Sequence, residues 1–132
     1  DDFGTVINPT IVHGQVHGGI AQGLGPALFE SVQLDATGQP LTGSFMDYAI
    51  ARADDVPDIE AENDESQPFP HNLLGAKGCG ESGAVGAPAA IVSAVLDALR
   101  PLGVAEIAMP LTPERVWKAV HDALSGSGRG AA

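Results

Sequence analysis

The chain has 132 residues, which is enough for one domain with a hydrophobic core. It carries 17 acidic and 6 basic residues, and the resulting formal net charge of −11 disfavours binding to nucleic acids or anionic membranes. One cysteine excludes an intrachain disulfide and suits a reducing compartment, and no signal peptide is visible, so we expect a cytoplasmic protein. No apolar stretch is expected to reach the roughly 20 residues of a membrane span.

The first expected element is a helix over residues 9–30, which begins after the turn signal Asn8-Pro9. Its interior contains several glycines, each of which costs a helix about 1 kcal/mol relative to alanine. Such a helix is stable only if it is buried and another part of the chain approaches its backbone closely. Its apolar positions follow helical spacing: Ile11, Val12, Val16, Ile20, Leu24 and Leu28.

Short strands are expected to follow, and together with the helices they predict an α+β fold. A hairpin turn at 35–40 separates the first two, and residues 66–86 are expected to form an extended loop. An acidic segment within residues 54–65 is expected on the surface. The expected strands are residues 31–34, 41–48, 59–64 and 104–109.

Two further helices are expected to pack at the end of the chain. One spans residues 87–99, with Pro88 in its first turn, and ends at Pro101 and Gly103. The other begins with Thr112 as N-cap and Pro113 as first residue. Its expected buried face holds Val116, Trp117, Val120 and Leu124, and residues 125–132 are expected to form a flexible tail.

The first candidate for chemistry is the glycine-rich loop 75–83, which contains one carboxylate, Glu81. Glycines allow backbone N–H groups to turn towards a ligand, and a carboxylate among them is a plausible general base. The loop lacks the Gly-Lys-Ser/Thr ending of a phosphate-binding loop. It also follows no clear strand, whereas a dinucleotide-binding fingerprint does follow one. By itself the pattern fits equally a structural turn with Glu81 merely exposed.

The second candidate is the helical face that carries Gln15 and Gln22 among glycines. Two amides on such a face could hydrogen-bond a flat, heteroatom-rich cofactor, but tight helix packing would explain the glycines as well. His13 and His17 have i, i+4 spacing, but two ligands do not make a zinc site. Cys79 has no nearby His or Asn to activate it, so we expect a small packed residue there.

Read in order, five motifs closely resemble the end of the large subunit of the xanthine dehydrogenase family of molybdenum hydroxylases. The bacterial carbon monoxide and aldehyde dehydrogenase type is most similar. The resemblance covers about residues 1–124, which we expect to be the carboxy-terminal part of a molybdopterin-binding domain. The motifs are residues 8–9, 14–25, 43–48, 77–83 and 111–117.

The resemblance implies a catalytic base and a set of cofactor contacts. Glu81 is expected to accept a proton as water-derived oxygen attacks an electron-poor substrate carbon, either of an aldehyde or of an N-heterocycle; oxidation of carbon monoxide is a further option. Gln15 is expected to contact the pterin, and Gly80 to bring its backbone N–H near the metal. Lys77, Gly78 and Cys79 complete the expected cofactor-binding residues.

The expected cofactor is molybdopterin cytosine dinucleotide with molybdenum, and FAD and 2Fe-2S clusters are expected on partner chains, an FAD subunit and an iron–sulfur subunit. Cys79 and Ser82-Gly83 depart from the family pattern, and the second departure argues against xanthine as substrate. Family subunits are several hundred residues long and this chain lacks a starting Met. We therefore expect a fragment or split subunit that is inactive alone, with a non-catalytic domain on the same scaffold as the alternative.

Overall fold

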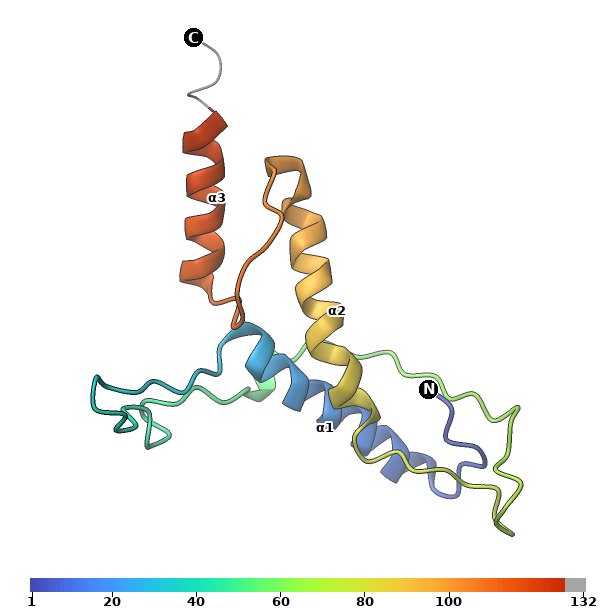
Figure 1. Ribbon diagram of the computed structural model, residues 1–132. Coiled ribbons are helices and arrows are strands. Elements are labelled where there is room, and N and C mark those ends of the chain that lie inside the picture. The colour runs from blue at the N-terminus through green and yellow to red at the C-terminus, as the bar shows by residue number, and fades with distance from the viewer. Residues whose placement is uncertain (128–132) are drawn as a thin grey trace.

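A computed structural model of the chain describes residues 1–127 and contains three long helices, which Figure 1 labels. Two short 3-10 helices accompany them, and the residues 128–132 of the expected tail lie outside the described part. The helices are α1 (Pro9–Leu28), η1 (Ala53–Asp55), α2 (Ser82–Leu99), η2 (Arg100–Leu102) and α3 (Pro113–Ser127).

Helix α1 begins where the sequence predicts and ends two residues earlier. The Asn8 side chain accepts a hydrogen bond from the backbone N–H of Ile11 at 3.1 Å, and Pro9 occupies the first turn, where a missing N–H costs nothing. At the other end, Phe29 and Glu30 both donate their N–H groups to the carbonyl of Gly25. Local capping chemistry therefore sets both ends.

Helix α2 crosses α1 in direct backbone contact, in keeping with the expected close approach to the glycine-rich helix (Figure 1). A Cβ added to Gly19 would lie 3.0 Å from the backbone nitrogen of Ala84. One turn further on, a Cβ added to Gly23 would lie 2.8 Å from the Cβ of Ala87. Any side chain at these positions would separate the helices, so the glycines allow the crossing.

Helix α2 begins at Ser82, five residues before the expected start. Ala84 and Val85 donate their backbone N–H groups to the carbonyl of Glu81, which serves as the N-cap residue. Pro88 therefore lies in the second turn, not the first, and cannot donate to the carbonyl of Ala84. Packing against α1 offsets that cost, a tertiary effect that local sequence signals do not contain.

The apolar stretch Ser82–Leu102 is 21 residues long and is apolar enough to cross a membrane by length and composition alone. The expectation that no stretch reaches this length was therefore wrong. The glycine, serine and proline residues of Ser82–Leu102 interrupt the apolar run but leave its average hydropathy high enough for a membrane span. One such helix is weak support for a membrane span, since the core helices of soluble proteins share these properties.

The small core lies between α1 and the N-terminal segment. Phe3, Val12 and Val16 are buried together, and the partly buried side chains of Val6, Ile20, Ala61 and Cys79 pack against them.

Two backbone hydrogen bonds tie the N-terminal segment to the glycine-rich loop. Thr5 donates to the carbonyl of Gly75 at 3.0 Å, and Lys77 donates to that of Phe3 at 2.8 Å.

The expected strands are absent from residues 1–127, so the described fold is helical and the α+β assignment was wrong in this respect. Isolated bridges remain, such as the antiparallel bridge between Leu34 and Pro40 at the predicted hairpin turn. Residues 59–64 retain only a parallel bridge from Asp2 to Asp64, and residues 104–109 pair with no strand within the described chain. A strand forms only against a partner, which this part of the chain does not supply.

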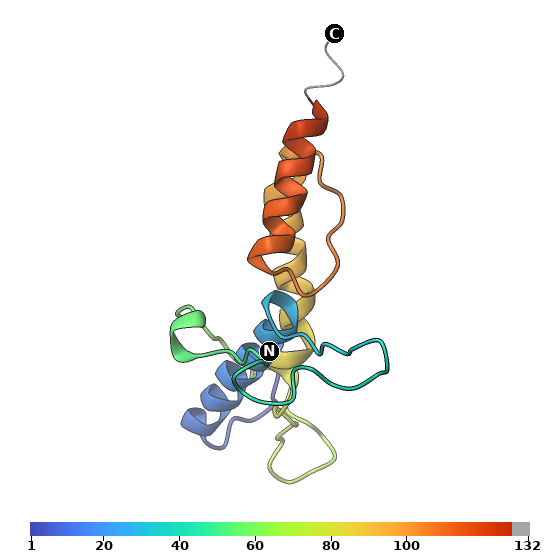
Figure 2. The same ribbon diagram turned by 90° about the vertical axis from the view of Figure 1, so that its left-hand side faces the viewer.

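Helix α3 stands beside the outer half of α2 in both views and contacts η2 (Figures 1 and 2). Thr112 caps it as predicted, accepting from the N–H of Arg115 at 3.3 Å, and Gly103 ends η2 in a left-handed conformation. The expected buried face was wrong in part, because Trp117 is 64% exposed and Leu124 is 58% exposed. Neither α1 nor α2 packs closely enough on α3 to cover them.

The loop between η2 and α3 returns to the end of α1. There, the buried Leu111 donates its N–H to the carbonyl of Ala27, also buried, at 2.6 Å. Arg115 reaches back from α3 to donate to the carbonyls of Ala108, Met109 and Pro110. This loop and α1 therefore form a second point of attachment, separate from the core around Phe3.

Candidate cofactor-contact site

The candidate site is the loop 77–81, which lies between the N-terminal segment and the start of α2 (Figure 1). Lys77 forms a salt bridge with Asp2, with its Nζ 2.6 Å from a carboxylate oxygen. The hydrogen bond from Lys77, together with one from the backbone N–H of Gly4, lowers the pKa of Asp2. Lys77 therefore fastens the loop to the chain terminus in addition to its expected role towards a cofactor.

Cys79 is half-buried and packs against the cluster of Phe3, Val12 and Val16, as expected for a small packed residue. Its neighbours Gly78 and Gly80 are exposed. A Cβ added to Gly78 would meet no atom within 4 Å. The thiol side of the loop is thus anchored in the core while the glycine backbone on either side remains open to a ligand.

Gln15 and Gly80 are brought together from positions 65 residues apart in sequence, since a Cβ added to Gly80 would lie 3.9 Å from the Gln15 Oε1 atom. Both residues are exposed. Glu81 follows directly as the N-cap residue of α2, but its side chain makes no capping hydrogen bond and is exposed. An amide and an open peptide backbone therefore lie side by side, and an exposed carboxylate follows at the next residue of the chain.

This set of groups fits a pterin-type cofactor by its chemistry. A pterin presents ring nitrogens and a carbonyl, which pair with the donors and acceptors of an amide side chain and a peptide backbone. The absence of Cβ atoms at positions 78 and 80 leaves the space such a flat group needs. Gln15 and Gly80 would hold the group, and Glu81 would face its reacting side.

The other sequence candidates do not form sites among the described residues. The rings of His13 and His17 are tilted by 45° with centroids 5.6 Å apart, but no group of three or more potential metal-ligating side chains occurs in residues 1–127. His121 is exposed and stacks on Trp117. The acidic side chains of 54–65 are exposed, which confirms the expectation of a surface segment.

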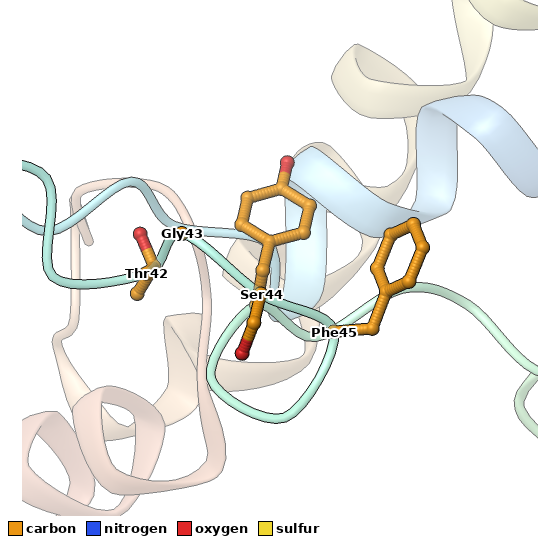
Figure 3. Close-up of a pocket in the computed structure, with 5 residues that line it drawn as sticks. Thr42, Gly43, Ser44 and Phe45 are labelled. Atoms are coloured by element: carbon orange, nitrogen blue, oxygen red, sulfur yellow. The ribbon is translucent and has the colours of Figure 1, made fainter.

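A pocket of about 470 Å³ lies elsewhere, in the loop that follows α1 (Figure 3). It is lined by Thr42, Gly43, Ser44, Phe45 and Tyr48. The only titratable group among these, the Tyr48 phenol, donates to Glu30 at 2.8 Å. The pocket lining offers hydroxyl groups but no carboxylate, imidazole, amine or thiol, and we therefore place the candidate site at the loop 77–81 instead.

Sequence reasoning missed the residues that set the geometry of the site. Gly83 was treated only as a departure from a family pattern, although a Cβ there would lie 2.6 Å from the carbonyl oxygen of Val16. Gly19 lies on the helical face of Gln15 and Gln22 and packs against α2, as expected from the tight helix packing considered for the glycines of that face. The interior glycines of the expected helix were a signal of a close approach, though they could not identify the approaching segment. Asp2 gave no sequence signal.

Comparisons with known proteins identify the family to which the chain is similar. Residues 1–57 match the family model of the molybdopterin cofactor-binding domain. The nicotine 6-hydroxylase large subunit of Paenarthrobacter nicotinovorans is 45% identical over 90% of this chain and 14% of its own length. The carbon monoxide dehydrogenase large chain of Hydrogenophaga pseudoflava is 40% identical over 92% of this chain and 15% of its own length.

Solved structures give the same result. The crystal structure of quinoline 2-oxidoreductase from Pseudomonas putida 86 superposes with a TM-score of 0.86 and 48% sequence identity, covering 92% of this chain and 15% of that one. The chain therefore belongs to the xanthine dehydrogenase family of molybdenum hydroxylases, whose members are molybdopterin-dependent oxidoreductases. It spans 14–15% of the length of the two curated relatives described above.

Proposed function

We propose that this chain forms one wall of a molybdenum hydroxylase active site and supplies its general base, Glu81. The observation that carries the proposal is the proximity of the Gln15 amide to the open backbone of Gly80, with the exposed Glu81 carboxylate at the next residue. The similarity to molybdenum hydroxylases over nine-tenths of the chain supports the assignment of this surface to the cofactor.

The chain's own residues divide the work between binding and proton transfer. Gln15 hydrogen-bonds the heteroatoms of the pterin, and the N–H of Gly80 donates near the metal end. Molybdenum on the pterin supplies the redox and Lewis-acid chemistry when it is bound. Glu81 accepts a proton from the attacking water at a carboxylate oxygen. The loss of this proton makes the water oxygen a better nucleophile. Lys77, Gly78 and Cys79 hold the loop in the orientation this requires.

For the substrate we propose an N-heterocycle in preference to an aldehyde or carbon monoxide. Two similar proteins, at 45% and 48% identity, are named for nicotine and quinoline, which contain electron-poor nitrogen rings. The carbon monoxide dehydrogenase chain is 40% identical. A ring carbon next to a nitrogen is electrophilic enough to be attacked once Glu81 has removed the proton from water, and the two electrons of the C–H bond that breaks there would pass to the redox centre that the bound cofactor supplies.

We further propose that the chain works within a larger assembly with an FAD subunit and an iron–sulfur subunit. The relatives carry the names "large subunit" and "large chain", which implies smaller companion chains, and this chain matches only 14–15% of their length. The cofactor would be the cytosine dinucleotide form of molybdopterin. A non-catalytic domain on the same scaffold is the second candidate function, because the described site is exposed and holds few enclosing side chains.

The test is Glu81→Gln in the assembly that contains this chain, with turnover expressed per bound molybdenum. General-base catalysis contributes about 10²–10⁴-fold, so we expect a loss of that size with unchanged molybdenum content. Glu106→Gln is the matched control, since Glu106 is also exposed and lies in the loop before α3. Turnover by Glu81→Gln within about threefold of the wild type would refute the base assignment. A wild-type assembly that binds no molybdenum would favour the non-catalytic domain.

A further inference from the structure

The crossing of α1 and α2 has no room for a side chain at Gly83. A Cβ added there would lie 2.6 Å from the carbonyl oxygen of Val16, 2.9 Å from the backbone nitrogen of Ile20 and 3.2 Å from the carbonyl carbon of Gly19. All three are backbone atoms of α1, so no rotation of a side chain can relieve the overlap. Only a movement of one helix away from the other can do so.

Gly83 is linked to Glu81 by rigid local structure. Glu81 accepts backbone hydrogen bonds from Ala84 at 3.0 Å and Val85 at 3.1 Å, and the Ser82 hydroxyl donates to the carbonyl of Cys79 at 3.4 Å. The loop 79–81 is therefore tied by hydrogen bonds to the first turn of α2. On the opposite side, Val16 follows Gln15 directly on α1, so Gly83 lies between the two halves of the site.

We infer that Gly83 is a positioning residue, whose missing side chain sets the distance between Gln15 on α1 and Glu81 at the start of α2. The inference rests on the proposed function, since this distance has a catalytic meaning only if Gln15 holds the cofactor and Glu81 acts on it. An alanine at position 83 pushes the start of α2 outward and moves Glu81 away from the place that Gln15 defines.

The chain contains matched controls for this effect. Gly86 lies in the same helix three residues later, and a Cβ added there meets no atom within 4 Å. On α1, Gly18 is equally open, whereas a Cβ at its neighbour Gly19 would lie 3.0 Å from the nitrogen of Ala84. Gly83→Ala and Gly19→Ala should therefore displace the loop, while Gly86→Ala and Gly18→Ala should only favour the helix.

The first experiment uses Cys79 as a reporter, because it is the only cysteine in the chain and packs half-buried beside the crossing. We expect Gly83→Ala to accelerate the reaction of Cys79 with an aromatic disulfide reagent about tenfold, with Gly86→Ala within about twofold of the wild type. An acceleration equal to the change in the unfolding equilibrium constant, measured in urea, would assign Gly83 to overall stability and overturn the inference. If Gly83→Ala does not fold, Gly19→Ala against Gly18→Ala decides the question by the same criteria.

The second experiment measures turnover per bound molybdenum in the assembly. Gly83→Ala should lower kcat about tenfold or more with molybdenum content retained, and Gly83→Ala combined with Glu81→Gln should be no slower than Glu81→Gln alone. Independent, multiplying losses would show that Gly83 does not act through Glu81. If Glu81→Gln has no effect, the proposed function fails, whereas the displacement reported by Cys79 stands or falls separately.

Discussion

Phe3 offers the sharpest test of what holds the loop 77–81 in place. Its side chain is 2% exposed and packs with Val12 and Val16 under the loop, and its carbonyl accepts the N–H of Lys77. A phenylalanine buries about 150–250 Å². At about 25 cal/mol per Å² this corresponds to roughly 4–6 kcal/mol for the whole residue. Part of that remains with alanine, so we expect Phe3→Ala to lower the free energy of unfolding by about 3–5 kcal/mol.

Urea denaturation followed by circular dichroism measures this loss, and Phe45→Ala is the matched control. Phe45 is 85% exposed, so the same chemical change should alter the free energy of unfolding by less than about 0.5 kcal/mol. A loss below about 1 kcal/mol for Phe3→Ala, or equal losses for both variants, would refute the assignment of Phe3 to the core. Because the core is small, Phe3→Ala should also bring the chain close to its unfolding threshold at room temperature.

Two further predictions concern protonation. The hydrogen bond from Tyr48 to Glu30 raises the pKa of the phenol above its ordinary 10.0, so its stabilising effect is complete below pH 10 and is lost as the pH rises through the folded pKa. Tyr48 is the only tyrosine, so a titration followed by phenolate absorbance reports on it alone and should show a midpoint above pH 10.0. Glu30→Gln should lower this midpoint. Equal midpoints in the native and the urea-unfolded chain would contradict the prediction. The Lys77 salt bridge lowers the pKa of Asp2 below 3.8, so its stabilisation is present above that pH and is lost as the pH falls through the folded pKa. The difference in urea midpoint between the wild type and Asp2→Asn, with Asp58→Asn as exposed control, should therefore shrink between about pH 6 and about pH 3, and a constant difference would exclude the salt bridge as its source.

The helix starts at Pro9 and Pro113 were predictable because capping is local chemistry. Asn8 and Thr112 each accept a backbone N–H from three residues further on, and the following proline suits a first turn in any surroundings. The start of α2 was not predictable in this way. Gly83, Gly86 and Pro88 all disfavour a helix locally, and the contact with α1 that compensates for them involves residues about 65 positions away.

The predicted strands are missing for a related reason, because strand formation also depends on distant parts of the chain. Alternating apolar and polar residues predict a strand only when another strand is available to pair with it, and residues 104–109 meet none within the described chain. The sequence of α3 likewise has an apolar stripe at helical spacing, which predicts a buried face. Trp117 on this stripe nevertheless remains exposed, because no other element in residues 1–127 covers it.

The candidate site was predictable in its members and not in its arrangement. Gln15 and Glu81 were found through the order of motifs, and the structure adds that the amide of Gln15 lies beside Gly80. The salt bridge between Asp2 and Lys77 joins residues 75 positions apart, and the motif that contains Lys77 gives no indication that Asp2 is its partner. Sequence reasoning therefore supplied the candidate residues, whereas their arrangement in space depends on tertiary contacts.

The apolar composition of α2 also bears on how hydropathy is used to assign membrane-spanning helices from sequence. A hydropathy window records only how unfavourable water is for a segment, and it gives the same answer whether the alternative is lipid or the backbone of another helix. Gly83 and Ala87 show that the first turns of this helix pack at backbone distance on α1, a contact that requires missing side chains, whereas contact with lipid does not. Small residues spaced one turn apart within an apolar window can therefore indicate a protein neighbour that the window alone cannot reveal.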